Sequence, residues 1–342
     1  MSKPILSIII PHYGGYDLLT ECINSIRESD ISNYELIIVN NDPNDLSLKS
    51  INLKTNEYII TSNYNRGYAG GCNFGSKKAI GKYLVFLNND TALNSSWFDP
   101  LLETMESNDL VSSCQPKILN YFNRDKFDYA GGSGGYIDYL VYPFARGRIF
   151  STIESDLGQH NDIKQIFWAS GTCFITRSKI FHTMNGFDET LFAHMEEIDY
   201  HWRCQLAGYK VFSNPNSIIF HKGAQTLSYN SFWKKYYNHR NSIYLLLSNY
   251  SFSNSIIFFI PRLFLELFSC IHDLIKLKFK NVIAHILSWI WITINIKKIY
   301  RKRIENKKIR TVNDNLLLNS TIFSRSIVID YFIRNKKKVT EL

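Results

Sequence analysis

Apolar runs and helix-like segments alternate along the first 120 residues. Four runs are almost wholly apolar, at residues 6–10, 34–39, 58–61 and 83–87. Runs of this length suit strands that are buried on both faces. Between them, apolar residues at helical spacing (18–26) and a short segment opened by two glycines (69–80) predict helices. The alternation predicts an α/β fold, with helices flanking both faces of a mostly parallel sheet.

Polar residues follow two of these strands directly. Residues 40–45 (Asn-Asn-Asp-Pro-Asn-Asp) follow the second strand, and residues 88–90 (Asn-Asn-Asp) follow the fourth. In sheets of this class, ligands bind beyond the carboxyl ends of the strands. Both clusters are therefore expected at a binding site.

The pattern is less regular after residue 120. Residues 131–135 (Gly-Gly-Ser-Gly-Gly) predict a flexible loop, which would cradle a phosphate only if a helix followed it. A strand is expected at 167–177 with Gly171 inside it, and a turn at 186–189. Residues 196–207 predict a helix that Gly208 terminates. A short strand at 217–221 ends on His221.

From residue 242 the chain becomes strongly apolar. One apolar stretch without a charge, 282–296, has 15 residues, whereas a helix that spans a membrane needs about 20. Its polar members His285, Ser288 and Asn295 share one face at helical spacing, which favours a helix lying in the membrane interface. The alternative is a helix packed on the catalytic domain or on a second subunit.

The positive charge lies in the same C-terminal third. Residues 1–240 hold 22 Lys/Arg against 24 Asp/Glu, and residues 241–342 hold 17 against 6. A basic run at 297–310 follows the apolar segment directly. This placement favours contact with anionic lipid and argues against a nucleic-acid-binding core. With 45% hydrophobic and 20% charged residues, the 342-residue chain has enough apolar side chains for a folded core.

The six cysteines occur without a CxxC pair or zinc-site spacing. We therefore interpret them as reduced thiols of a cytosolic protein. The apolar run at 6–10 is too short for the core of a signal peptide, so export is not expected.

Three groups at or near predicted element ends suggest chemistry. Asp90 and His221, both at strand ends, form a donor set that suits one divalent cation. A carboxylate of the pair Glu196 and Glu197 has the chemistry to take a proton from an attacking hydroxyl. Each group also has a structural explanation, because acids at a helix start stabilise its dipole and a single histidine is often structural. Their joint occurrence favours an active site.

A series of short motifs accompanies these residues in a fixed order. They are Ser7-Ile-Ile-Ile-Pro11-His-Tyr13, Val39-Asn-Asn-Asp-Pro43, the glycine-rich segment 65–75, Leu87-Asn-Asn-Asp-Thr91, Ser170-Gly-Thr172, 186–189, 196–203, His221 and Arg240-Asn241. In this order they resemble family 2 glycosyltransferases of the GT-A fold, particularly the rhamnosyltransferase-like branch of bacterial surface polysaccharide synthesis. The resemblance covers residues 6–241, about two-thirds of the chain.

The resemblance implies an inverting transfer from a nucleotide-diphosphate sugar. Asp90 and His221 would bind Mg²⁺ or Mn²⁺, and Glu197 would be the general base. The implied donor-binding residues are Pro11, Tyr13, Asn40, Asn41, Asn65, Arg66, Gly67, Asn73, Asn88 and Asn89. The implied acceptor-side residues are Gly171, Glu196, Asp199, Trp202 and Arg203.

Three positions depart from the family pattern. Asn40 and Asn88 stand where aspartates are usual, which leaves the base preference open and makes Asp90 the chief carboxylate ligand. Glu197 stands where aspartate is more usual. The two asparagines also motivate an alternative, a catalytically inactive GT-A scaffold in an assembly complex. A dinucleotide-binding oxidoreductase is excluded, because no GxGxxG follows the first strand.

The prediction for the whole chain has two parts. Residues 1–241 form a GT-A catalytic domain, and residues 242–342 form a helical, apolar and basic tail that associates with an anionic membrane or with a second copy. The expected donor is dTDP-rhamnose, with a UDP-hexose or UDP-galactofuranose as the alternative. The expected acceptor is a lipid-linked glycan, and no nucleic acid partner is expected. The expected location is cytoplasmic, peripheral on the inner face of the cell membrane.

Overall fold

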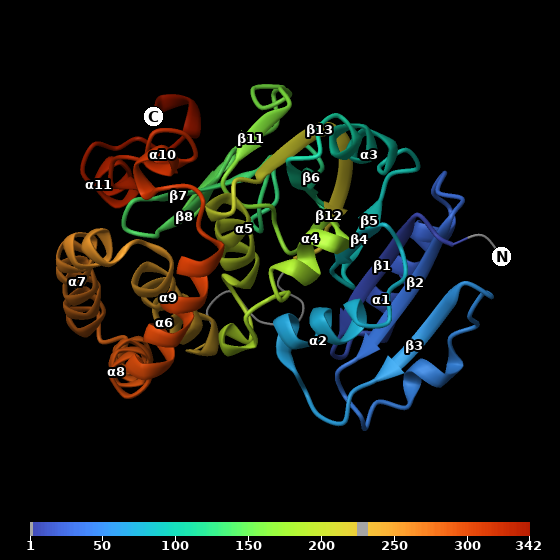
Figure 1. Ribbon diagram of the computed structural model, residues 1–342, viewed down its shortest axis with the longest axis horizontal. Coiled ribbons are helices and arrows are strands. Elements are labelled where there is room, and N and C mark those ends of the chain that lie inside the picture. Colours follow the sequence, from blue (N-terminus) through green and yellow to red (C-terminus); the bar gives the residue numbers. More distant parts are fainter. Residues whose placement is uncertain (1–2, 224–231) are drawn as a thin grey trace.

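The computed structural model describes residues 3–223 and 232–342. Its centre is a nine-stranded sheet in the order β11-β13-β6-β12-β4-β1-β2-β3, with β5 paired to β13 (Figure 1). The strands are β1 (Leu6–His12), β2 (Tyr34–Asn40), β3 (Glu57–Thr61), β4 (Tyr83–Leu87), β5 (Thr91–Leu93), β6 (Val111–Asn120), β11 (Lys164–Ile166), β12 (Cys173–Arg177) and β13 (Lys210–His221). The pairs β1–β2, β2–β3 and β1–β4 are parallel, whereas β12 runs antiparallel to both β4 and β6. The α/β class is confirmed, and the sheet is mixed.

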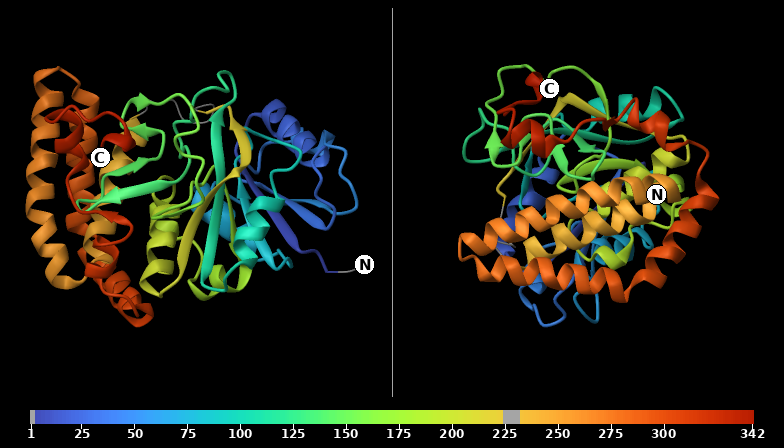
Figure 2. Two further views of the ribbon diagram at one scale, coloured as in Figure 1. Left: turned by 90° about the horizontal axis from the view of Figure 1, so that it is seen from above. Right: turned by 90° about the vertical axis from the view of Figure 1, so that its left-hand side faces the viewer.

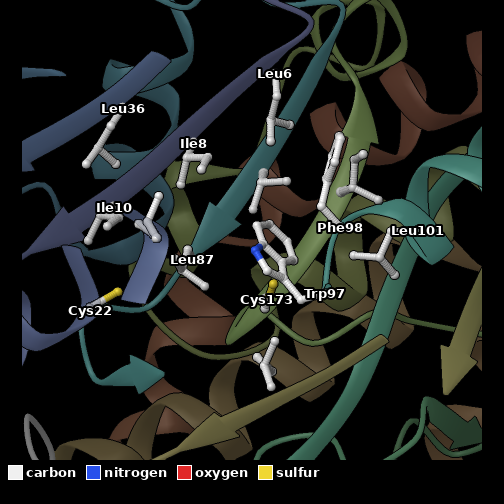
Figure 3. Close-up of a cluster of buried hydrophobic side chains, with 14 of the residues drawn as sticks. Leu6, Ile8, Ile10, Cys22, Leu36, Leu87, Trp97, Phe98, Leu101 and Cys173 are labelled. Carbon is white, nitrogen blue, oxygen red and sulfur yellow. The ribbon is translucent and has the colours of Figure 1, made fainter. Parts of the chain in front are cut away.

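Helices cover both faces of the sheet, which explains why its central strands are apolar throughout. On one face, α1 (Tyr16–Arg27) and α3 (Asp99–Glu106) pack on alternate residues such as Ile8 and Leu36 (Figure 3). On the other, α2 (Gly67–Ser76), α4 (Ser178–Thr183) and α5 (Glu196–Leu206) pack on the intervening residues, including Ile9 and Ile37. Alternation across a strand places neighbouring residues on opposite faces, so both sets are buried.

A smaller five-stranded sheet follows β6. Its order is β10-β9-β8-β7-β14, formed by β7 (Gly135–Asp138), β8 (Pro143–Ala145), β9 (Arg148–Ile149), β10 (Thr152–Ile153) and β14 (Ile322–Phe323). Residues 131–134 form a loop as expected, and all of residues 131–135 are buried where the chain enters this sheet. A Cβ at Gly135 would lie 2.0 Å from the Trp168 ring. The glycine therefore permits close packing.

The strand expected at 167–177 is shorter than predicted. Only β12 (Cys173–Arg177) pairs in the central sheet, and Gly171 lies in the turn that precedes it. The helix expected at 196–207 is α5, and Gly208 follows it with φ of +89°, as a terminating glycine requires. The strand expected at 217–221 is the end of the longer β13.

Four helices form a layer at one end of the molecule: α6 (Phe232–Asn249), α7 (Phe252–Ile275), α8 (Phe279–Ile294) and α9 (Ile296–Ile309), with α7 and α8 outermost (Figures 1 and 2). The expected boundary at 241/242 falls inside α6. After α10 (Asp314–Leu318), β14 pairs with β7, and α11 (Ile327–Phe332) follows. Short 3₁₀ helices lie at η1 (Ser47–Ser50), η2 (Glu189–Leu191) and η3 (Val339–Glu341). The C-terminal third therefore packs directly on the rest of the chain.

One helix of this layer is long and apolar enough to cross a membrane, and a second stretch would qualify if two bent helices formed one span. One is α7, with 24 residues, and the other is α8 and α9 together, which bend by 67° at Asn295. The segment expected as one helix at 282–296 thus ends at Ile294, and Ile296 begins the basic helix α9.

Candidate active site

Two ladders of the central sheet bring Asp90 and His221 together. β5 begins directly after Asp90, and its first residue, Thr91, pairs with His221 at the end of β13. The backbone N–H of Lys222 donates to the Asp90 carbonyl at 3.0 Å, which fixes the register. As a result, His221 Nε2 lies 3.0 Å from Asp90 Oδ1. The structure thus places these two predicted ligands side by side.

Asp128, a residue that the sequence reasoning missed, holds the other side of this imidazole. Its Oδ1 lies 2.9 Å from His221 Nδ1, and its backbone N–H bonds to the Ile118 carbonyl at 2.9 Å beside β6. Burial alone lowers the pKa of His221, but the Asp90 and Asp128 carboxylates outweigh it and raise that pKa to about 10. Without a metal the imidazole is therefore a buried cation between two carboxylates.

The residues present fit a divalent cation. Asp90 Oδ1 and His221 Nε2 are both buried and face each other at 3.0 Å, and within the described ranges neither atom has a further hydrogen-bond partner. Ligand atoms that share one octahedral ion at about 2.1 Å lie about 3 Å apart, which matches their separation. Asp128 would then accept the second ring proton, as carboxylates do behind metal-binding histidines.

Glu196 and Glu197 open α5 and are enclosed together. Glu197 is half-buried, but neither its Oε2 nor that of Glu196 has a hydrogen-bond partner in the part of the chain that the structure describes. Burial raises the pKa of Glu197 to about 7, against backbone N–H groups that include that of Gly171. Burial and then the Glu197 charge raise the pKa of Glu196 well above its usual range. Glu197 is therefore the member of the pair that is poised to accept a proton near neutral pH.

A strained loop aims this pair. His194 and Met195 adopt φ of +66° and +72°, in the left-handed region that residues with side chains rarely occupy. The Asn241 side-chain amide donates to the carbonyls of Ala193, at 3.0 Å, and His194, at 2.6 Å. Asn241, the last residue of the recognised motif series, thus contributes by holding the backbone before Glu197.

Gly171 lies against α2 close to the same pair. The Tyr68 hydroxyl donates to its carbonyl at 2.5 Å, and a Cβ at Gly171 would meet that hydroxyl oxygen at 3.1 Å. The backbone at Gly171 also faces Glu197. The structure thus brings Gly171 and Glu197 together from two separate motifs.

The predicted donor-side asparagines tie together the ends of β1, β2 and β4. The Asn41 amide donates to the Gly67 carbonyl at 3.2 Å. The Asn89 amide lies 3.0 Å from His12 Nδ1 and donates to the Gly14 carbonyl at 3.2 Å. Asn40 Oδ1 accepts from the backbone N–H of Asp42 at 3.0 Å. These bonds shape the polar edge of the sheet where ligands are expected.

The remaining donor-side residues differ in exposure. Pro11 and Asn88 are half-buried, and Tyr13 is exposed. Asn65 accepts the Gly67 N–H at 2.8 Å, and the Arg66 guanidinium lies over the rings of Tyr64 and Phe74.

Asn73 has a structural position. Its amide donates to the Phe187 carbonyl at 2.9 Å and to Glu189 Oε1 at 3.1 Å, while its Oδ1 accepts the Phe187 N–H at 2.9 Å. These bonds join α2 to the turn at 186–189. Asn73 therefore positions the backbone, with its polar atoms committed to protein partners.

Three predicted acceptor-side residues are interior instead. Asp199 bonds Arg203 at 2.7 Å, and Arg203 donates to the Gly186 carbonyl at 2.7 Å. Trp202 packs edge-on against Phe167 and Tyr250. All three are buried, because the helix turns these positions towards the core and the C-terminal helices. They leave no surface for an acceptor, so that part of the prediction is corrected.

Comparison with known proteins agrees with this architecture. The family model for glycosyl transferase family 2 matches residues 7–184, more than half of the chain. The chain belongs to glycosyl transferase family 2. GalNAc-T7, in a crystal structure with UDP, GalNAc and Mn²⁺, superposes with a TM-score of 0.57 at 15% identity, over 72% of this chain and 48% of that one. This likeness shows the fold, and with the family match it confirms GT-A.

Two relatives of this family 2 chain have informative names. The O-antigen biosynthesis protein RfbC of Myxococcus xanthus is 24% identical over 247 residues, which are 69% of this chain and 19% of RfbC. The GalNAc(5)-diNAcBac-PP-undecaprenol beta-1,3-glucosyltransferase of Campylobacter jejuni is 31% identical over 106 residues, 29% of this chain and 34% of that enzyme. The chain thus spans about a fifth to a third of the length of these relatives.

Proposed function

We propose that this family 2 glycosyltransferase moves a sugar from a nucleotide-diphosphate donor onto a lipid-linked glycan, with inversion, during bacterial surface polysaccharide synthesis. The observation that carries the proposal is the buried Asp90–His221 pair at the edge of the sheet, with ligand atoms 3.0 Å apart. The enclosed Glu197 supports it as the base. The retained Asp90, Glu197 and His221 favour an enzyme over an inactive scaffold.

Asp90 and His221 would hold Mg²⁺ or Mn²⁺, which when bound neutralises the charge that develops on the departing diphosphate. Asp128 orients the imidazole through Nδ1. Glu197 takes the proton of the acceptor hydroxyl at a carboxylate oxygen, so that the hydroxyl attacks the anomeric carbon from the side opposite the nucleotide. Residues 1–241 carry this chemistry.

The donor is proposed to be dTDP-rhamnose, because Asn88-Asn89-Asp90 has the form typical of the rhamnosyltransferase-like branch. A UDP-hexose or UDP-galactofuranose is the second candidate, favoured by the UDP in the GalNAc-T7 structure. Turnover of a panel of these donors by the purified chain, in the presence of Mn²⁺, tests the assignment. We expect turnover of dTDP-rhamnose, and turnover of UDP-sugars alone would overturn the rhamnosyl proposal.

The lipid-linked acceptor is supported by the undecaprenol in the name of the Campylobacter relative. It is also supported by the basic run on α9, which places cations beside the apolar helices α7 and α8. We place the protein at the inner face of the cell membrane, where both the soluble donor and a membrane-bound acceptor are accessible.

Replacing Asp128 by asparagine is expected to weaken Mn²⁺ binding by about 10–100-fold, because the imidazole loses the carboxylate that fixes its tautomer and orientation. Calorimetric titration of Mn²⁺ in the presence of dTDP measures this. The matched control is Asp125→Asn, which removes an exposed acid from the same loop. Equal Mn²⁺ affinity in the two variants would contradict the role of Asp128.

Transfer activity is expected to rise with pH through about 7 and then level off. Burial raises the pKa of Glu197 to about 7, and only the deprotonated carboxylate accepts the hydroxyl proton. The measurement is kcat/KM against pH at saturating metal. A profile that is flat between pH 5.5 and 8.5, values that bracket this pKa by about 1.5 units each, would exclude Glu197 as the base.

A further inference from the structure

The outermost helices α7 and α8 bury several polar residues and expose most of their large apolar residues. On α7 the buried positions are Ser255, Arg262, Glu266 and Asp273, and on α8 they include His285 and Ser288. The exposed large apolar residues of the two helices are Phe252, Ile256, Ile257, Ile260, Leu263, Phe264, Leu267, Phe268, Ile271, Leu274, Ile275, Phe279, Ile283, Ile286, Leu287, Ile290 and Ile294. Here we call this set the outer face. It reverses the usual amphipathic arrangement of a surface helix.

The outer face is one continuous surface, because α7 and α8 run side by side across one end of the molecule (Figure 2). Phe264 is 58% exposed and Phe268 is 67% exposed. Apolar patches of this extent mark a contact with a membrane or with another protein.

A buried polar network holds the inner side of α7 to the rest of the chain. Arg262 bonds Glu266 at 2.7 Å and donates to the Leu140 carbonyl at 2.6 Å, in the turn between β7 and β8. The other Glu266 oxygen lies 2.8 Å from His239 Nδ1 and 3.3 Å from His285 Nδ1. His239, Glu266 and His285 are residue types that can bind a metal ion. The partners described here nevertheless satisfy the Glu266 carboxylate without one.

The network opposes a spanning α7. Its 24 residues reach about 36 Å, enough to cross a bilayer. Crossing would detach Arg262 and Glu266 from Leu140 and His239 and would put an ion pair into hydrocarbon, which is costly. Keeping the network requires α7 to stay parallel to the layer beneath it.

The charges around the outer face identify its occupant. Residues 252–304 contain only two acids, Glu266 and Asp273, and both are buried. The exposed lysines at 276, 278 and 280 join the two helices, and Lys297 and Lys298 begin α9. A second copy docked on this face by a two-fold axis would meet the same basic rim, which is repulsive. An anionic lipid surface is complementary to the apolar outer face through its acyl chains and to the surrounding lysines through its headgroups.

We infer that α7 and α8 lie in the plane of the membrane, with the outer face in the acyl-chain boundary of one leaflet and the lysine rim on anionic headgroups. This inference rests on the proposed function in one respect, namely that the acceptor is bound to the membrane. It specifies the mode of attachment, an in-plane anchor on one leaflet.

Binding of the full-length chain to sedimented vesicles of phosphatidylcholine with phosphatidylglycerol tests the surface. The double variant Phe264→Glu/Phe268→Glu is expected to lower the partition coefficient at least about tenfold. Phe122→Glu/Leu157→Glu, which changes two exposed apolar residues of the catalytic domain, is the matched control and should bind like the parent. Equal binding of the two double variants would overturn the inference. Lys297→Glu/Lys298→Glu should abolish the preference for phosphatidylglycerol.

Depth-dependent quenching by spin-labelled lipids separates an in-plane from a spanning helix. A fluorophore is attached to cysteine at Ser253, Leu263 or His272, all exposed on α7, in a Cys270→Ser chain whose other cysteines are buried. Similar shallow depths at the three sites support the in-plane anchor. A site at 263 much deeper than the other two would show a spanning helix and overturn it.

Two further measurements separate the remaining outcomes. A lipid-free dimer that Phe264→Glu/Phe268→Glu converts to monomer, together with no vesicle binding by the parent chain, would assign the face to a second copy and overturn the inference. Binding of dTDP and UDP with Mn²⁺ is measured on the same preparations. Normal nucleotide binding without vesicle binding would refute the membrane anchor but not the proposed transferase activity. Vesicle binding without nucleotide binding would refute the proposed transferase activity but not the anchor.

Discussion

Replacing Glu197 by glutamine is expected to lower transfer by about 10²–10⁴-fold. The amide has nearly the shape of the carboxylate but cannot take the acceptor proton, so the lost step is chemistry and donor binding remains. The measurement is the turnover rate on the donor that the panel identifies, with nucleotide affinity from calorimetry on the same variant.

Glu196→Gln is the matched control for this variant. Burial and the adjacent Glu197 raise the pKa of Glu196 well above its usual range, which favours the neutral form of the side chain, and glutamine is a close mimic of that form. We expect activity within about tenfold of the parent chain. A larger loss in Glu196→Gln than in Glu197→Gln would transfer the role of base to Glu196.

The substitution Glu197→Gln also has a predictable effect on the stability of the protein. The folded-state pKa of Glu197 is raised by burial to about 7, above its value of about 4.5 in an unfolded chain. Ionisation therefore destabilises the native state as pH rises through this window. Glu197→Gln should have a higher Tm than the parent at pH 8 and a similar Tm at pH 4, which also shows that its inactivity is not misfolding.

Replacing Asp90 by asparagine is expected to lower metal-dependent transfer by at least about a hundredfold. The change removes the carboxylate that lies 3.0 Å from His221 Nε2. Of the two proposed metal ligands, only the His221 imidazole then remains. Activity measured against Mn²⁺ concentration should shift to a much higher half-saturating concentration and a lower plateau.

Asn88→Asp is a control that should change the Mn²⁺ requirement in the direction opposite to Asp90→Asn. It restores a second carboxylate two residues before Asp90, at a half-buried position, and should lower the Mn²⁺ concentration needed for half-maximal activity. Unchanged metal dependence in Asp90→Asn would place the cation elsewhere and remove the main support for the proposed mechanism.

Local patterns predicted the strands and the polar residues that follow them. β1, β2, β3 and β4 cover the apolar runs. The strands β1, β2 and β4 are buried on both faces and therefore apolar at nearly every position, whereas the edge strand β3 is partly exposed. The convergence of Asp90 with His221 was also expected, since both end strands of one sheet. The glycine after α5 was predictable as well, because its left-handed φ of +89° favours glycine.

Other features depend on contacts between distant segments. Asp128 lies 93 positions before His221, and no motif or periodicity marks it. Asp199, Trp202 and Arg203 belong to a recognisable helix motif, but which side of α5 faces the core depends on α6 and α9. Residues 131–135 have a loop composition, and only the approach of Trp168 shows why they are buried glycines.

The sequence by itself determined the α/β class, the family and the order of the chemical groups, because these follow from periodicity and from motifs of adjacent residues. The tertiary structure alone decided that Asp128 supports His221. It also decided that α7 buries Arg262 and Glu266 while exposing Phe252, Phe264 and Phe268. The sequence of a largely apolar helix does not by itself determine which of its faces is buried. Its orientation is set by the partners that satisfy its few polar groups, and here those partners are Leu140 and His239, more than twenty residues away in the chain.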